Sequence, residues 1–428
     1  MTQSPSPAIR MPLFLLCAAA MAVGSSGCEH TGLMKTPNLY LASDSNPFAE
    51  LPDARKTVAV DLIYATDRTP LSDPKEPQGT GVQFGHGRGD SLSFGRATVA
   101  LGEHVTWGDL EAASLTRRRE RRFVPHLVHT EPLGQFPPSS EAWRAPATAD
   151  GLAAAELARA VDAALEGADR REAFVFVHGY NNQFYHATLT MAQLWHFMGR
   201  PGVPVVYSWP AGRGGLRGYT ADSASSVFTV FHFKQFLRAL AAAPGLDKIH
   251  ILAHSRGTDV ATVAIKELLL EYRGMGRDPR AALKLGNLVL AAPDLDLDIV
   301  NQSLVAEGAI FVPEQFTVYL SQGDRALRLS SWLTDSFKRL GSLIFSDLDP
   351  NEQAELSRLP NMTFIDADVE SDITGHAYFW INPAASSDVI LLLRDNAAPG
   401  AENGRPLVRQ SENFWLLKDD YLLHNAGE

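Results

Sequence analysis

Short hydrophobic runs alternate with longer mixed segments along most of this chain. Runs typical of buried strands occur at 174–177, 203–209, 248–253, 287–292, 316–320 and 362–365, and we expect the last of them to close the sheet. Helices are predicted between them, over about 186–198, over a segment that ends near Ala243, from after Ser255 to about Tyr272, and over 388–393. Strands that alternate with helices predict an α/β fold, with a mostly parallel central sheet and helices on both faces.

The part of the chain before this alternation is less regular. Strands are predicted at 57–64 and 93–101, a Gly- and Pro-rich loop at 73–90, and a Pro-rich irregular segment at 131–148. Residues 28–56 are rich in Pro, Ser, Asn and Asp, which predicts a flexible tether. The expected organisation is therefore a tether over 28–56, one domain over 57–396 and a C-terminal extension over 397–428.

Charge narrows the choice of partners. The chain has 428 residues and a formal net charge of −11, an acidic balance that argues against nucleic acid as a partner. One short basic run, residues 117–122, stands out, and its plainest interpretation is a solvated strand or loop.

The first residues resemble an export signal, which we expect to span 1–27. Arg10 precedes an apolar stretch at 11–23 that is shorter than the roughly 20 residues a membrane-spanning helix needs. Small residues then lead to Cys28, as in a bacterial lipobox, although Ser25 stands where Leu is usual. The prediction is an acylated Cys28 and a protein anchored in a bacterial cell envelope, at the outer membrane or the periplasmic face. Ordinary cleavage, with Cys28 a stray thiol, is the alternative.

Cysteine usage fits the same prediction. The only other cysteine, Cys17, lies in the part that would be removed. The mature chain would then hold a single cysteine and no internal disulfide, although the compartment is oxidising.

One segment carries the pattern of a serine nucleophile. The predicted strand 248–253 runs into Ala253-His254-Ser255-Arg256-Gly257, and a predicted helix follows. A sharp strand-to-helix turn of this kind lifts a serine above the sheet, and the residues two before and two after it must be small. Ala253 replaces the usual first glycine. Ser255 is the predicted nucleophile.

A serine hydroxyl needs a base, and the base needs an orienting acid. In this type of fold the chain order is serine, acid, histidine. Only His376 and His424 follow Ser255, and His424 lies near the chain end, so His376 is the predicted base. Asp324, after the strand at 316–320, is the favoured acid, and Asp294, after the strand at 287–292, is the alternative.

Two backbone N–H groups are expected to stabilise an oxyanion. One belongs to Arg256, next to the nucleophile, and the other to Tyr180, in the loop after the strand at 174–177. His178, in the same loop, is expected to stabilise the turn rather than to act as a base.

Five segments occur in an order that resembles a bacterial α/β-hydrolase family of esterase- and lipase-like enzymes of unknown function: 176–182, 207–210, 253–257, 292–294 and 375–376. The resemblance covers roughly 57–394 and implies the fold and a Ser-His-Asp mechanism, but no substrate. We therefore expect a serine hydrolase that cleaves an ester or related acyl bond of a small or lipid-like substrate. Neither a metal cluster nor a dinucleotide-binding motif stands out, so no cofactor is expected. An acyltransferase with the same triad, and a non-catalytic envelope lipoprotein that uses the fold for binding, are the alternatives.

Overall fold

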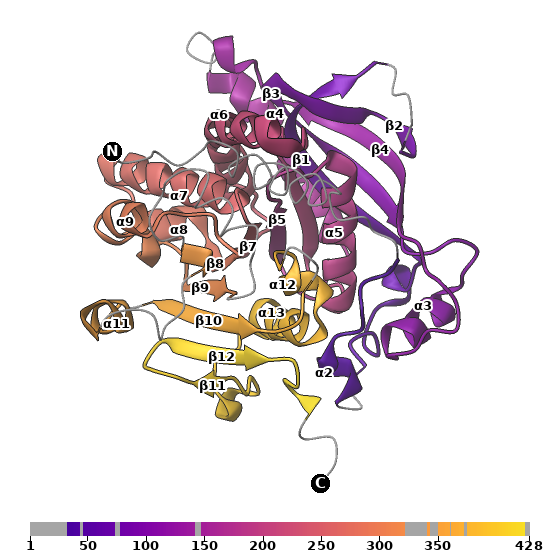
Figure 1. Ribbon diagram of the computed structural model, residues 1–428. Coiled ribbons are helices and arrows are strands. Elements are labelled where there is room, and N and C mark those ends of the chain that lie inside the picture. The colour runs from indigo at the N-terminus through magenta and orange to yellow at the C-terminus, as the bar shows by residue number, and fades with distance from the viewer. Residues whose placement is uncertain are drawn as a thin grey trace, which may run out of the picture.

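A single large sheet forms the centre of the molecule (Figure 1). The computed structural model describes residues 32–42, 46–72, 78–141, 147–321, 340–342, 350–359, 361–371 and 375–423. Within these ranges twelve strands lie in the order β11 (Val408–Arg409), β12 (Phe414–Lys418), β10 (Met362–Asp368), β9 (Gln315–Leu320), β8 (Leu285–Ala291), β7 (Lys248–His254), β5 (Glu172–Val177), β6 (Val203–Ser208), β1 (Ala59–Leu71), β3 (Gln83–Ala100), β4 (His126–Gln135) and β2 (Thr80–Gly81). Neighbouring strands from β12 to β1 are parallel, whereas β1–β3–β4 is an antiparallel meander.

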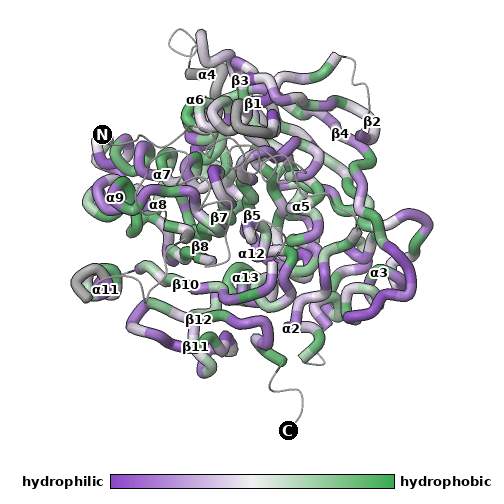
Figure 2. Tube along the Cα trace, viewed as in Figure 1, coloured by the Kyte–Doolittle hydropathy of each residue, from purple (hydrophilic) through white to green (hydrophobic). Residues whose placement is uncertain are grey.

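Helices cover both faces of the sheet, as the alternating pattern predicts (Figure 1). One face carries α4 (Ala147–Ala164), α6 (Gly215–Ala241), α7 (Gly257–Gly274) and α8 (Pro279–Leu283), and the other carries α5 (Phe184–Phe197), α12 (Tyr378–Ile381) and α13 (Pro383–Asp395). Shorter helices are α2 (Asn38–Leu41), α3 (Trp107–Ser114), α9 (Leu297–Val300) and α11 (Pro350–Ser357). Both cores are apolar, and hydrophobic stretches gather along the central elements in Figure 2.

Strand β5 shows why this sequence builds two cores. Val175 and Val177 point into the core beneath α6 and α7, whereas Phe174 and Phe176 point into the core beneath α5 and α13. Successive side chains of a strand alternate between faces, so a strand with an apolar side chain at every position must be covered on both sides. The predicted α/β fold is confirmed.

Two predicted irregular segments are strands instead. Residues 83–90, predicted as loop, belong to β3, which pairs with β1 as far as Leu71 and Gln83. Residues 131–135, predicted as irregular because of Pro132, belong to β4. The β3–β4 register shifts beside Pro132. A proline, which cannot donate to the ladder, is tolerated at such an irregularity.

The C-terminal extension completes the sheet, so the prediction that 362–365 closes it is wrong. Strand β12 pairs with β10 on its outer side. The Arg405 guanidinium, fully buried, donates to Asp388 at 2.7 Å, and the Tyr421 hydroxyl donates to the same carboxylate at 2.8 Å. These long-range contacts attach residues 405–421 to α13.

Much of the segment predicted as a tether is packed, so the prediction is wrong for the described residues 32–42 and 46–56. Leu33, Met34 and Phe48 are buried. The Leu33 N–H donates to Phe123 O at 2.8 Å, and the Met34 N–H donates to Gln193 Oε1 at 2.7 Å. Composition misled the prediction because a few apolar side chains between polar ones suffice to hold the segment. The predicted signal peptide and Cys28 lie outside the described residues.

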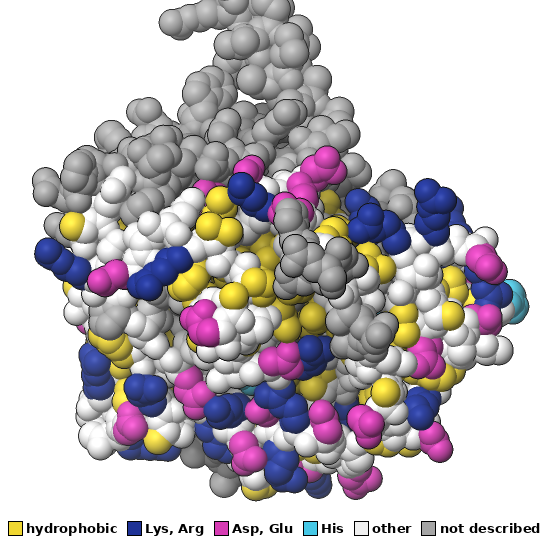
Figure 3. All heavy atoms as spheres, turned by 90° about the horizontal axis from the view of Figure 1, so that it is seen from below, with side chains coloured by type: hydrophobic (Ala, Val, Ile, Leu, Met, Phe, Trp, Pro, Cys, Tyr) yellow, Lys and Arg dark blue, Asp and Glu magenta, His cyan; other side chains and the backbone are white. Residues whose placement is uncertain are grey.

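The basic run lies next to this packed segment and is irregular and largely exposed, as expected. Arg119 is the exception, because its guanidinium donates to Leu33 O at 2.7 Å and to Ala113 O at 2.9 Å. Among the residues that the structure describes, no helix is both long and apolar enough to cross a bilayer. On the face seen in Figure 3, acidic and basic side chains are interspersed.

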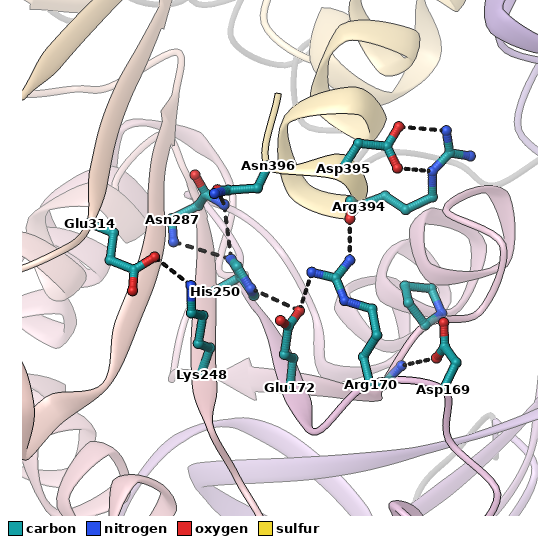
Figure 4. A network of polar contacts seen from close by, with 12 residues as sticks. Asp169, Arg170, Glu172, Lys248, His250, Asn287, Glu314, Arg394, Asp395 and Asn396 are labelled. Carbon is teal, nitrogen blue, oxygen red and sulfur yellow. Dashed lines mark hydrogen bonds and ion pairs between the residues drawn. The ribbon is translucent and has the colours of Figure 1, made fainter. Parts of the chain in front are cut away.

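A network of polar side chains joins α13 to the amino-terminal ends of the central parallel strands (Figure 4). His250 Nδ1 accepts from the Asn287 N–H at 3.1 Å, so His250 Nε2 donates to Glu172 at 3.2 Å. Arg170 pairs with Glu172 at 2.5 Å and donates to Arg394 O. Glu172, His250 and Asn287 lie near the amino-terminal ends of β5, β7 and β8, whereas Ser255 follows the carboxyl end of β7, so the network is remote from the predicted nucleophile.

Candidate active site

Ser255 occupies a strained turn between β7 and α7. Its φ of 52° lies in the left-handed region, which non-glycine residues seldom adopt. The Ser255 N–H donates to Ala291 O at 3.0 Å, and Ser255 O accepts from the Thr258 N–H at 3.0 Å and from the Thr258 hydroxyl at 2.6 Å. These bonds hold the serine in the conformation that the strand-to-helix motif requires.

Two glycines allow neighbouring chains to approach this turn. A Cβ on Gly257 would lie 2.4 Å from His178 O and 2.7 Å from Val177 O, so α7 begins directly against the end of β5. A Cβ on Gly179 would lie 2.6 Å from Ser255 Cβ. Ala253, in contrast, is accommodated with its methyl group fully buried. The loop after β5 therefore lies directly against the predicted nucleophile.

That loop carries the predicted oxyanion donor of Tyr180. His178, which precedes it, is buried and stacks on Trp209 with ring centroids 5.2 Å apart. His178 Nδ1 donates to Gly179 O at 2.9 Å, so Nε2 is the nitrogen that accepts from Arg68 at 3.2 Å. Burial, reinforced by the Arg68 charge, lowers the pKa of His178 well below its usual value. A neutral, fully engaged imidazole fits the structural role expected for His178.

The second predicted donor, the Arg256 N–H, lies at the N-terminus of α7, where Arg256 is the cap residue. The positive end of the helix dipole favours a developing negative charge at this position. The Arg256 side chain turns elsewhere, because it pairs with Asp259 at 2.7 Å and with Asp294 at 2.8 Å.

His376 lies beside the same turn. Its ring centroid is 4.7 Å from that of His254, and its carbonyl oxygen accepts from His254 Nε2 at 3.1 Å. His376 is half-buried, whereas His254 is buried. The structure thus brings the predicted base to the residue that precedes the predicted nucleophile. His424, the rejected alternative, lies outside the described residues.

The two candidate acids differ in their surroundings. Asp294 is buried and paired with Arg256, the residue after the predicted nucleophile. Asp324 lies outside the described residues, and β9, the strand before it, ends at Leu320. The Arg256 contact gives Asp294 a clear structural task, while the assignment of the acid to Asp324 stays a prediction.

Comparison with known proteins places this geometry in a family. A family model described as an alpha/beta hydrolase of unknown function (DUF900) matches residues 153–394, more than half of the chain. The chain belongs to this α/β-hydrolase family. The match includes Ser255, Asp294, Asp324 and His376 but ends before the C-terminal strands.

Solved structures show only slight likeness to the hydrolase. An inhibited esterase B from Lactobacillus rhamnosis is 13% identical, with a TM-score of 0.30, over 54% of this chain and 78% of that one. An arylesterase is 14% identical, with a TM-score of 0.21, over 60% of this chain and 76% of that one. No curated protein matches the chain.

Sequence reasoning missed three side chains that shape the site of this hydrolase. The Tyr378 hydroxyl donates to Tyr319 O at 2.9 Å and accepts from the Ala292 N–H at 3.3 Å, which fixes the His376 loop over the ends of β8 and β9. Arg68 and Asp222 bind the loop that contains Tyr180. The only signal for Arg68 was a charged Asp-Arg pair shortly after the predicted strand 57–64, and Asp222 and Tyr378 carried none. Within the described ranges no three His, Cys, Asp or Glu side chains are grouped as around a metal ion.

Replacing Gly179 by alanine tests the close approach to Ser255. The added methyl group would overlap the Ser255 side chain, so we expect Gly179→Ala to lower the free energy of unfolding by about 1–3 kcal/mol, as overpacked sites do. Gly151→Ala is the matched control, because Gly151 lies in α4 with open space around it, and alanine should stabilise that helix by up to about 1 kcal/mol. Urea denaturation measures both, and equal stabilities for the two variants would contradict the packing described.

Proposed function

We propose that this α/β-hydrolase is a serine esterase that cleaves carboxylic esters through an acyl-enzyme. The observation that carries the proposal is the left-handed Ser255, which lies against Gly179 and next to the His254–His376 ring pair. A strained, positive φ at a non-glycine residue is costly and is typical of functional sites.

The proposed reaction has two stages. Ser255 Oγ attacks the ester carbonyl carbon while His376 accepts the hydroxyl proton, and the proton then passes to the departing alcohol. Water, deprotonated by the same imidazole, attacks the acyl-enzyme and releases the acid. In both stages the Tyr180 and Arg256 N–H groups donate to the oxyanion. Asp324 orients His376 and stabilises its protonated form.

Two alternatives share the site or the fold. An acyltransferase would use the same triad with an alcohol in place of water, and product analysis with added alcohols separates the two. A binding module would leave Ser255 unreactive, so it would not be labelled by a fluorophosphonate probe. The presence of Ser255 and His376 at the same turn favours chemistry over binding alone.

Loss of the nucleophile is the central test. Ser255→Ala should abolish hydrolysis of p-nitrophenyl esters and labelling by a fluorophosphonate. His376→Ala should be about as damaging, and the double variant little worse than either, because residues that act as one unit are strongly non-additive. Rates across esters of increasing chain length would also define the acyl preference. Unchanged turnover in Ser255→Ala would contradict the esterase assignment. If the loss of activity in the double variant equalled the product of the two single losses, His376 would not act in the same mechanism as Ser255.

The acid is tested by comparing two amide substitutions. Asp324→Asn should lower kcat by about 10⁴, as expected when the imidazole loses its orienting carboxylate. Asp294→Asn should lower kcat far less, because its carboxylate holds Arg256. The comparison needs variants of equal thermal stability, and the opposite ranking would assign the role to Asp294.

We also propose that Cys28 carries the lipid anchor, on the strength of the lipobox-like residues before it. Cys28→Ser should block acylation and release the protein from membranes, as followed by palmitate labelling and fractionation. Glu29, which is not Asp, leaves the protein free to reach the outer membrane, and the fraction that contains it tests this point. Membrane-bound, palmitate-labelled Cys28→Ser would refute the anchor.

A further inference from the structure

Two buried charged side chains hold the loop that presents the Tyr180 N–H. Asp222, on α6, accepts the Asn181 N–H at 3.1 Å through its Oδ2. Arg68, at the bulged part of β1, donates to Asn182 O at 2.7 Å. The chain direction after Tyr180 is thus fixed on both sides of Asn181, which has a left-handed φ of 53°.

The same two side chains also hold the neighbouring loop after β6. Asp222 Oδ2 accepts a second N–H, that of Gly212, at 3.1 Å. Arg68 donates to Ala211 O at 2.8 Å and to the Ser208 hydroxyl at 2.9 Å. One carboxylate oxygen and one guanidinium therefore connect the two loops. The carboxylate accepts from an N–H group of each loop, and the guanidinium donates to oxygen atoms of each loop.

Burying these two charged side chains costs free energy that a purely structural role would not explain. Both side chains are 1% exposed, and the other carboxylate oxygen of Asp222, Oδ1, is buried without a hydrogen bond among the described residues. Burial raises the pKa of Asp222 and lowers that of Arg68 to about 9, so both ionised forms are disfavoured. A buried charge whose hydrogen bonds are incomplete is poorly suited to stabilising a fold and is more frequent at functional sites.

We propose that Arg68 and Asp222 are positioning residues that hold the Tyr180 N–H in place for the oxyanion. The proposal rests on the esterase function proposed above. Oxyanion donors are effective only when they are aimed at the oxyanion before it forms, so a loop without regular secondary structure needs external support. Neither side chain would touch the substrate, and their effect would pass through the backbone of residues 180–182.

The conservative and the disruptive substitution of Asp222 should differ. In Asp222→Ala both N–H groups lose their acceptor, and kcat should fall by about 10²- to 10³-fold, as when one oxyanion donor is removed, with KM changed only a few-fold. Asp222→Asn should retain most of the activity, because a single amide oxygen can accept the two N–H groups that Oδ2 accepts now. Kinetics with p-nitrophenyl butyrate, in variants with a wild-type melting midpoint, measure both.

Arg68→Lys gives a second, milder test that does not depend on the folding of Asp222→Ala. An ammonium cannot reproduce the planar set of donors that reaches Ser208, Ala211 and Asn182, so kcat should fall about tenfold at unchanged KM. Arg88→Lys is the control for the same change at an exposed position, since Arg88 contacts α6, through Ser225 at 3.0 Å, but touches neither loop. It should leave kcat unchanged.

A transition-state probe separates positioning from general loosening. Inhibition by butylboronic acid, which forms a tetrahedral adduct with serine, should weaken in parallel with kcat/KM across the series. Wild-type kcat in a folded Asp222→Ala, or equal losses in Arg68→Lys and Arg88→Lys, would overturn the proposal while Ser255→Ala still abolished activity. If Ser255→Ala kept its activity, the esterase function itself would fail first.

Discussion

The contact between the turn at Ser255 and the end of β5 is the constraint on which the rest of the site depends. Gly257 places the first residue of α7 against the carbonyl groups of Val177 and His178, and Gly179 places the next loop against Ser255. Because neither glycine has room for a methyl group, Ser255, the N-terminus of α7 and the loop of Tyr180 are packed directly against one another. The left-handed φ of Ser255 is held by this packing and by the Ala291 and Thr258 hydrogen bonds.

Around that contact the hydrolase uses polar groups in two different ways. At the amino-terminal ends of the strands, and between Asp388, Arg405 and Tyr421, polar side chains form hydrogen bonds that join distant segments. Near the site, Arg68 and Asp222 serve main-chain groups of irregular loops, and one oxygen of Asp222 lacks a partner among the described residues. The first arrangement secures the architecture, and the second fixes loops that no strand or helix would hold.

The sequence predicted local features far better than contacts between distant segments. The parallel sheet followed from apolar runs, and the turn of Ser255 followed from five consecutive residues with a strand before them and a helix after them. The position of His376 beside that turn agrees with the chain order, while its role stays a prediction. The contacts of Arg68, Asp222 and Tyr378 could not be foreseen, because most of them join residues more than 40 positions apart. Composition also misjudged residues 32–42 and 46–56, since a flexible tether and a segment packed on the domain can share the same polar residues.

The packing of the segment that begins at Gly32 limits how far Cys28 can lie from the domain. Four peptide units separate Cys28 from Gly32, the first described residue, and they can span at most about 14 Å. The next residue, Leu33, is already bonded to Phe123 and Arg119. A lipid on Cys28 would therefore be joined to the folded domain by only a few residues, and not by a long flexible tether. Under the proposed anchoring, the hydrolase would be held close to the bilayer, with the segment at Leu33 near the point of attachment.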